Sequence, residues 1–145
     1  MDIKNTVIKP KRQSKYEVER NSMLFKNRNQ AGVHLLVDFW FTKNIEDKSK
    51  IKQILIEAGK RANSVPLKTS IHKFNPHGIT GIVLLAESHI SIHSWPEIAY
   101  VGLDIFTCGD SAKPHEALEY LKSQFNPKEM DVRELKRGVI KNFKV

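Results

Sequence analysis

The feature that most constrains the fold is the close spacing of four strand-like runs in the middle of the chain. These runs are rich in β-branched and aromatic residues and cover residues 67–74, 79–86, 89–95 and 99–107. The turns between them are short, and two of them contain the typical turn-forming sequences Asn75-Pro76-His77-Gly78 and Pro96-Glu97. A parallel crossover connection needs about a dozen residues. The four runs are therefore predicted to form an antiparallel meander.

Two amphipathic helices are expected, one before and one after this meander in the sequence. Residues 45–62 place apolar side chains at the i, i+3, i+4, i+7 spacing of a helix, and Thr42 or Asn44 is expected to cap its start. A second helix is expected to begin near Ser111, with Pro114 in its first turn. Its apolar positions follow the same spacing, so each helix has one face to bury.

Further strand-like runs at residues 33–41 and 130–140 complete the pattern. Two helices and about six strands in this order predict an α+β fold, a two-layer sandwich of a mainly antiparallel sheet with both helices on one face. One run of the meander alternates two isoleucines with His89, Ser91, His93 and Trp95. The sheet face that the helices leave bare is therefore expected to be buried against something else.

Length and charge suggest one domain with a basic tail. The chain has 145 residues, enough for one domain with a sizeable core. Residues 1–30 contain eight Lys or Arg against three Asp or Glu, and so carry most of the net charge of +8. We expect residues 1–30 to be a basic, disordered tail and residues 31–145 to form a single domain. The tail's simplest role is solubility; the alternative function is a non-catalytic basic module that binds RNA or an anionic membrane surface.

The sequence contains no candidate membrane anchor. No segment approaches the roughly 20 consecutive apolar residues of a membrane span, and the N-terminal segment lacks the apolar centre of a secretory signal. Cys108 is the single cysteine, so an internal disulfide is excluded. We therefore expect a cytoplasmic protein with no membrane partner.

Reactive side chains interrupt the apolar stretch LLAESHISIHSW at residues 84–95. His89 and His93 suggest a metal site, but residues four apart on a strand lie about 13 Å apart, whereas both ligands must lie about 2 Å from one Zn²⁺. We therefore expect no metal. A hydrolase with Cys108 as nucleophile and one imidazole as base remains open from these residues alone.

Two longer stretches together are much more specific. Ala86-Glu87-Ser88-His89-Ile90-Ser91-Ile92-His93-Ser94-Trp95-Pro96-Glu97 and Asp104-Ile105-Phe106-Thr107-Cys108-Gly109 strongly resemble the short bacterial and archaeal type of S-adenosylmethionine decarboxylase proenzyme. The resemblance covers roughly residues 31 to 140 and includes Phe74-Asn75-Pro76-His77-Gly78. It implies that the chain cuts itself between Glu87 and Ser88 into residues 1–87 and 88–145, and that Ser88 becomes a pyruvoyl cofactor.

The resemblance also implies the reaction and the role of each site residue. The pyruvoyl group would form a Schiff base with S-adenosylmethionine and release CO₂, which yields the aminopropyl donor for polyamine synthesis. His93 matches the base of self-processing, and Thr80 matches a position, usually serine, whose hydroxyl assists it. Cys108 matches the proton donor of decarboxylation. Phe74 matches an aromatic that stacks on adenine, and Glu97 a carboxylate that binds the ribose hydroxyls. Taken alone, Phe74 could instead be a core residue and Glu97 an exposed turn residue.

Besides Thr80, three positions depart from the family's pattern. The family usually has an aromatic and a glycine after Pro-Glu, where this chain has Ile98 and Ala99, and it often has a larger apolar residue at the position of Ala31. These departures lie where substrate could touch. The departures therefore bear on the identity of the substrate. The resemblance implies one close alternative activity, a pyruvoyl-dependent arginine decarboxylase on the same scaffold, because that specificity arises within the family.

Spacing predicts that two chains share each site. Ser88 and His93 are five positions apart, which is about 16 Å along an extended strand and far beyond the roughly 3 Å that a general base needs. A two-fold partner would bring the two together and bury the bare sheet face, giving an αββα sandwich. We expect a homodimer in which Ser88 and Cys108 of one chain face four residues of the other: Thr80, His93, Glu97 and Phe74.

Overall fold

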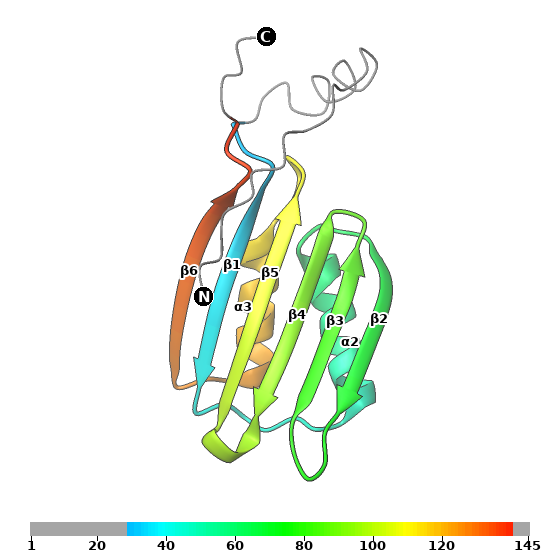
Figure 1. The fold of residues 1–145 in the computed structure, drawn as a ribbon, viewed down its shortest axis with the longest axis vertical. Coiled ribbons are helices and arrows are strands. Elements are labelled where there is room, and N and C mark those ends of the chain that lie inside the picture. Colours follow the sequence, from blue (N-terminus) through cyan, green and yellow to red (C-terminus); the bar gives the residue numbers. More distant parts are fainter. Residues whose placement is uncertain (1–28, 141–145) are drawn as a thin grey trace, which may run out of the picture.

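The computed structural model describes residues 29–140, which form a single six-stranded antiparallel sheet with two helices. The strands are β1 (Gly32–Trp40), β2 (Pro66–Lys73), β3 (Ile79–Leu85), β4 (Ser88–Trp95), β5 (Tyr100–Cys108) and β6 (Glu129–Arg137). Their order across the sheet is β2-β3-β4-β5-β1-β6 (Figure 1). The predicted meander is confirmed, because β2 to β5 are consecutive antiparallel neighbours. The predicted tail lies outside the described residues, except for Asn29 and Gln30.

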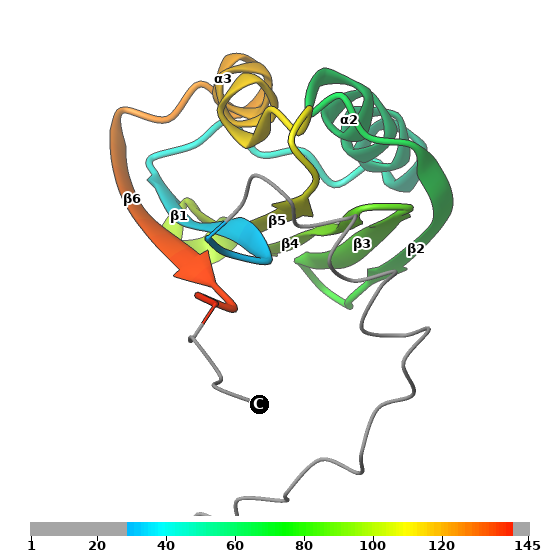
Figure 2. The ribbon, with the colours of Figure 1, turned by 90° about the horizontal axis from the view of Figure 1, so that it is seen from above.

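The two helices, α2 (Lys48–Arg61) and α3 (Pro114–Phe125), lie side by side on one face of the sheet (Figure 2). The predicted two-layer α+β sandwich is confirmed. A short 3₁₀ helix, η1 (Pro96–Ile98), joins β4 to β5. No helix within residues 29–140 is both long enough and apolar enough to cross a membrane.

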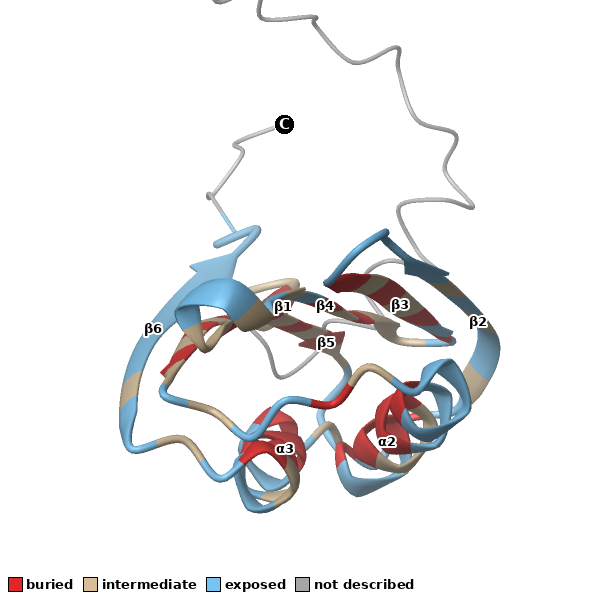
Figure 3. Ribbon diagram, turned by 90° about the horizontal axis from the view of Figure 1, so that it is seen from below, coloured by how far each residue is buried: buried red, intermediate tan, exposed pale blue. Residues whose placement is uncertain are grey.

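The core lies between the helices and the sheet, and it follows the sequence periodicity. Figure 3 shows the buried side of both helices turned toward the sheet. On the four inner strands, β3, β4, β5 and β1, buried core positions alternate with positions on the bare face. The largest fully buried side chains are those of Phe39, Phe125, Leu35, Ile51, Leu55, Ile79, Ile90, Ile92, Ile105 and Leu121. Each such side chain stabilises the fold by about 1.5 to 3 kcal/mol relative to exposure, so this layer holds the sheet in place.

The predicted cap of the first helix was wrong. Asp47 caps α2, because its side chain accepts a hydrogen bond of 2.9 Å from the Lys50 amide. Thr42 and Asn44 lie too far before the first helical residue, Lys48, to cap the helix. The Thr42 amide instead donates to the carbonyl of Ala99, so the chain leaving β1 is bound to the loop before β5 and cannot yet begin a helix.

Three other boundaries differ from the predictions. The first strand ends at Trp40 because Phe41 takes a left-handed φ of 55°. The second helix begins at Pro114 rather than near Ser111, since proline with its fixed φ suits the first helical position. The last strand ends at Arg137, and Gly138 follows with a φ of 61°. The remaining strand ends lie within one residue of the prediction.

Candidate active site

The turn between β3 and β4 presents the Glu87–Ser88 peptide at one end of the sheet. Two hydrogen bonds fix this turn to the loop after α2. The Ala86 amide donates to the carbonyl of Val65 at 2.9 Å, and the Val65 amide donates to the Glu87 carboxylate at 3.0 Å. The peptide bond predicted to be cut is thus held rigidly on a surface turn.

The carbonyl oxygen of Glu87 is surrounded by donors from the end of β5. The Cys108 amide donates to it at 3.2 Å, and the Cys108 thiol donates at 2.6 Å. β1 packs tightly against this end of β5 because residue 32 is glycine: a Cβ there would lie 2.5 Å from the Thr107 carbonyl oxygen. Two donors aimed at one carbonyl oxygen stabilise the negative charge that develops when a nucleophile attacks its carbon.

The Ser88 hydroxyl lies next to an imidazole that the sequence prediction did not assign to catalysis. Its Oγ is 3.3 Å from Nδ1 of His89. The half-buried His89 ring packs edge-on against Phe106, with centroids 5.9 Å apart. Adjacent residues on a strand normally point to opposite faces, so alternation gave no signal for this contact. It occurs at the first residue of β4, where the strand leaves the turn.

A second cluster lies toward the other end of β4. Thr80 and His93 are paired across β3 and β4, and Oγ1 of Thr80 is 2.5 Å from Nδ1 of His93. A cavity of about 320 Å³ adjoins this pair, and it is also lined by Phe74 and Glu97. Phe74 is 50% exposed, so it is not the core residue that the alternative interpretation suggested.

Glu46 holds the loop beside this cavity, and the sequence prediction missed it. Its Oε1 accepts a hydrogen bond of 3.0 Å from the Gly78 amide, and this bond is the main reason that the pKa of Glu46 lies below its usual value. The Phe74 amide in turn donates to the carbonyl of Gly78 at 2.9 Å. Glu46 is thus linked through Gly78 to the backbone of Phe74. The contact spans 32 positions, so no local pattern could reveal it.

A chain of polar side chains joins β1 to β4 on the bare face. Asp104 accepts from the Ser91 hydroxyl at 3.0 Å and lies 3.1 Å from Nε2 of His34. Arg137 lies 3.0 Å from Nδ1 of His34. A guanidinium can only donate, so Nδ1 accepts, and Nε2–H of a neutral His34 donates to Asp104.

Tyr100 occupies the same face near the second cluster. Its hydroxyl donates to Asp38 at 2.5 Å, and burial together with this bond raises its pKa to about 12. The ring packs on both Trp40 and Trp95, with centroids 4.5 and 5.3 Å apart. The bare face is therefore an ordered polar and aromatic surface, with Trp95 still 43% exposed.

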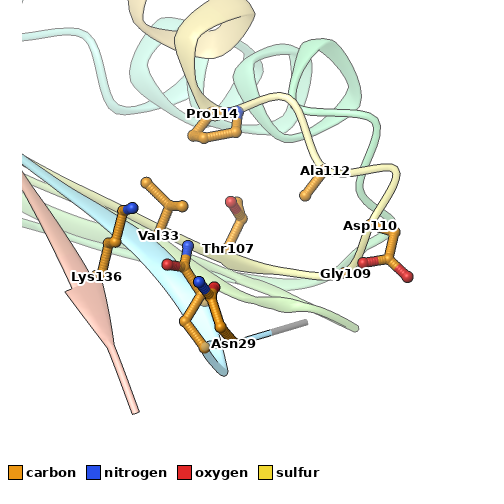
Figure 4. Close-up of a pocket in the computed structure, with 10 residues that line it drawn as sticks. Asn29, Val33, Thr107, Gly109, Asp110, Ala112, Pro114 and Lys136 are labelled. Carbon is orange, nitrogen blue, oxygen red and sulfur yellow. The ribbon is translucent and has the colours of Figure 1, made fainter. Parts of the chain in front are cut away.

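A cavity of about 290 Å³ lies on the helix side of the sheet at the same end as Ser88, between the sheet and the start of α3 (Figure 4). Thr107, the strand partner of Ser88, is fully buried at its wall, and its hydroxyl has no hydrogen-bond partner within residues 29–140. The cavity has room for several water molecules, each of which takes about 30 Å³ in the liquid.

The predicted site residues thus form two groups. Glu87, Ser88 and Cys108 lie together at the turn, while Thr80, His93, Phe74 and Glu97 lie together around the other cavity. Within one chain the groups are separated by most of β4, about 16 Å between Ser88 and His93. In the part of the chain that the structure describes, no group of three or more His, Cys, Asp or Glu side chains could hold a metal ion.

Comparison with known proteins is consistent across sequence and structure. Residues 33–138 match the family described as S-adenosylmethionine decarboxylase. The chain is 38% identical over 113 residues to an S-adenosylmethionine decarboxylase proenzyme of Methanococcus maripaludis strain C7, covering 77% of this chain and 93% of that protein. It is 41% identical over 114 residues to the proenzyme of the same name from Thermodesulfovibrio yellowstonii, covering 75% and 82%. The crystal structure of the adenosylmethionine decarboxylase from Aquifex aeolicus VF5 superposes with a TM-score of 0.73 at 38% identity, covering 81% of this chain and 98% of that one.

Proposed function

The chain belongs to the S-adenosylmethionine decarboxylase family, as predicted from the sequence, and on that premise we propose that it cuts itself between Glu87 and Ser88 and decarboxylates S-adenosylmethionine with a pyruvoyl group made from Ser88. The product would be the aminopropyl donor for spermidine and other polyamines. The observation that carries the proposal is the Glu87 carbonyl, which accepts two hydrogen bonds from Cys108 beside the Ser88 hydroxyl. A non-catalytic basic module has no use for this arrangement.

The first step is attack of the Ser88 hydroxyl on the Glu87 carbonyl carbon. An Oγ–C bond forms and the C–N bond breaks, so the amide becomes an ester and residue 88 gains a free amine. Negative charge on the carbonyl oxygen is stabilised by the Cys108 amide and thiol. One such donor is typically worth a factor of about 10² to 10³ in rate, so these contacts are large enough to matter.

The second step is elimination, which requires a base at the α-proton of Ser88. Removal of that proton breaks the Cβ–Oγ bond, and Glu87 leaves as the new C-terminal carboxylate. The enamine left at residue 88 becomes an imine, to which water adds and from which ammonia departs, leaving the pyruvoyl ketone. The cavity beside Thr107 supports this last step, because it offers room for water next to the strand partner of Ser88.

His93 is the proposed base of the elimination, and it would come from a second copy of the chain. Its position about 16 Å along the strand prevents it from serving Ser88 of its own chain. The bare sheet face supports a two-fold partner, because it still exposes large apolar side chains: Leu84 is 46% exposed and Trp95 43%. In a homodimer of this kind the two sheets would stack into an αββα sandwich with two shared sites.

In the mature enzyme the pyruvoyl group would withdraw the electrons released when CO₂ leaves the substrate. Cys108 lies next to residue 88 across the turn and would return a proton to the substrate carbon. The cavity lined by Phe74 and Glu97 suits the nucleoside, with the ring of Phe74 exposed for stacking on adenine. Stacking of a base on an aromatic side chain is worth about 1 to 3 kcal/mol.

Mass spectrometry of the purified protein tests the cleavage, and CO₂ release tests the reaction. The expected result is two fragments, residues 1–87 and 88–145, and release of CO₂ from S-adenosylmethionine but not from arginine. Ser88→Ala should remain full length and inactive, whereas Ser123→Ala, on the exposed side of α3, should be cleaved normally. An intact wild-type chain would refute self-processing, and release from arginine alone would assign the alternative substrate.

A further inference from the structure

We propose that His89 is the general base of the first step of self-cleavage, the group that takes the hydroxyl proton of Ser88 as its oxygen attacks Glu87. This inference rests on the proposed function and adds to it a residue for the step that His93 does not serve. Nδ1 of His89 lies 3.3 Å from Oγ of Ser88, close to the hydrogen-bond reach that a base needs.

No other described group of the same chain is placed for this task. The Glu87 carboxylate is turned away and accepts from the Val65 amide. The Cys108 thiol donates to the carbonyl that is attacked, so it acts on the oxygen and not on the nucleophile. His93 lies at the far end of β4 and is paired with Thr80. His89 is thus the described side chain in contact with the nucleophile itself.

The surroundings of His89 fix its ring. Phe106 packs edge-on against it, and the His34 ring lies 6.4 Å away in an edge-on orientation. His34 is itself held from both sides, by Asp104 at one nitrogen and by Arg137 at the other. A base held by its neighbours keeps Nδ1 directed at the hydroxyl, and this saves the entropy of orienting it during reaction.

His89 alone can carry the proton through the whole step. The hydroxyl proton passes to Nδ1 as the Oγ–C bond forms, and Cys108 holds the negative charge on the carbonyl oxygen. When the C–N bond breaks, the same proton passes from the imidazolium to the departing nitrogen of residue 88. An imidazole suits both transfers because it titrates near neutral pH. No oxidant, metal or co-reactant is needed.

The two histidines should therefore stop the reaction at different species. Without His89 the chain remains an ordinary amide at Glu87–Ser88. Without His93 it proceeds to the ester and stops there. The two species have the same mass, but hydroxylamine cleaves an ester at neutral pH and leaves an amide intact, so the chemistry distinguishes them.

The experiment compares His89→Asn, His93→Ala and the control His115→Asn, whose side chain lies on α3 next to Glu134. Asparagine can still hydrogen bond near the position of Nδ1 but cannot take a proton. We expect His89→Asn to be at least about a hundredfold slower in cleavage and to resist hydroxylamine. We expect His93→Ala to be cut by hydroxylamine at Glu87, and His115→Asn to self-cleave normally. A hydroxylamine-sensitive ester in His89→Asn, or cleavage near the wild-type rate, would overturn the proposal.

A second measurement leaves His89 in place and so does not depend on the folding of its variant. In the His93→Ala background only the first step is observed, as the appearance of hydroxylamine-sensitive chain after refolding. We expect the rate of this first step to rise with pH as the base loses its proton, and a rate that does not change with pH would refute the role of His89 as that base. If the wild-type chain itself is never cleaved, the proposed function fails instead, so the two failures are distinct.

Discussion

Co-expression of a Ser88→Ala chain with a His93→Ala chain tests whether two chains build each site. Neither variant alone should complete cleavage, because one lacks the proposed nucleophile and the other the proposed base of elimination. In a mixed dimer, the intact Ser88 of the His93→Ala chain would face the intact His93 of its partner. The opposite site would combine both substitutions and be inert. Some cleavage should therefore return when the two chains are mixed.

The expected yield follows from two-fold pairing. If the chains are made equally and pair at random, about half of the dimers are mixed, and one chain in each mixed dimer is cut. About a quarter of all chains should then be cleaved, and every fragment beginning at residue 88 should carry the His93→Ala substitution. Differently tagged copies allow mixed dimers to be isolated, and mass spectrometry identifies the cut chain. Isolated mixed dimers that stay uncut would show that His93 acts within its own chain, despite about 16 Å of intervening strand.

Cys108→Ala should slow self-cleavage by about a hundredfold, since it removes the thiol 2.6 Å from the Glu87 oxygen but leaves the backbone amide at 3.2 Å. It should also slow CO₂ release by about 10² or more, and a loss in CO₂ release alone would exclude the thiol from cleavage. Ala99→Gly should raise the midpoint of thermal unfolding by a few degrees, because the left-handed φ of 51° costs a non-glycine residue about 1 kcal/mol; a lower midpoint would contradict this reason. Tyr100→Phe should be less stable than wild type below pH 10, and the difference should shrink as pH rises toward about 12, since a folded pKa raised from 10.0 to about 12 gives stability that is lost through that range. Chemical unfolding at several pH values measures this difference in stability, and a difference that grows between pH 10 and 12 would contradict a raised folded pKa caused by burial and the Asp38 bond.

The fold could be predicted to the extent that it depends on local signals. Turn length alone excluded parallel crossovers and gave the meander, and side-chain periodicity gave both helices and their buried faces. The strand order could not be predicted, because β1 is inserted between β5 and β6 by pairings such as Leu35 with Ile105, which are 70 positions apart. The cap of α2 was missed for a similar reason: Thr42 suits a cap locally, but its amide is bound to Ala99.

The candidate site likewise contains residues that the sequence could identify and contacts that depend on the fold. The resemblance assigned Ser88, His93 and Cys108, because their types and spacing are distinctive in the sequence itself. It could not assign Glu46, whose contact with Gly78 depends on how the loop before α2 meets the loop before β3. The resemblance also did not assign His89. Side-chain alternation along a strand would direct His89 away from Ser88, but at the first residue of β4 the two side chains are in contact.

Strand β4 explains why reactive groups sit in an otherwise apolar stretch. Ile90 and Ile92 are fully buried against the helices, and they fix the strand in its register. Because side chains alternate, that register places His89 and His93 on the bare face, where a second copy could reach them. A slip by one residue would move both imidazoles into the core and both isoleucines to the surface, which the loss of apolar burial opposes. The packing of the two isoleucines between the histidines therefore determines which face the two proposed bases occupy. If the two sites are shared, one such strand supplies the nucleophile of one site and the elimination base of the other.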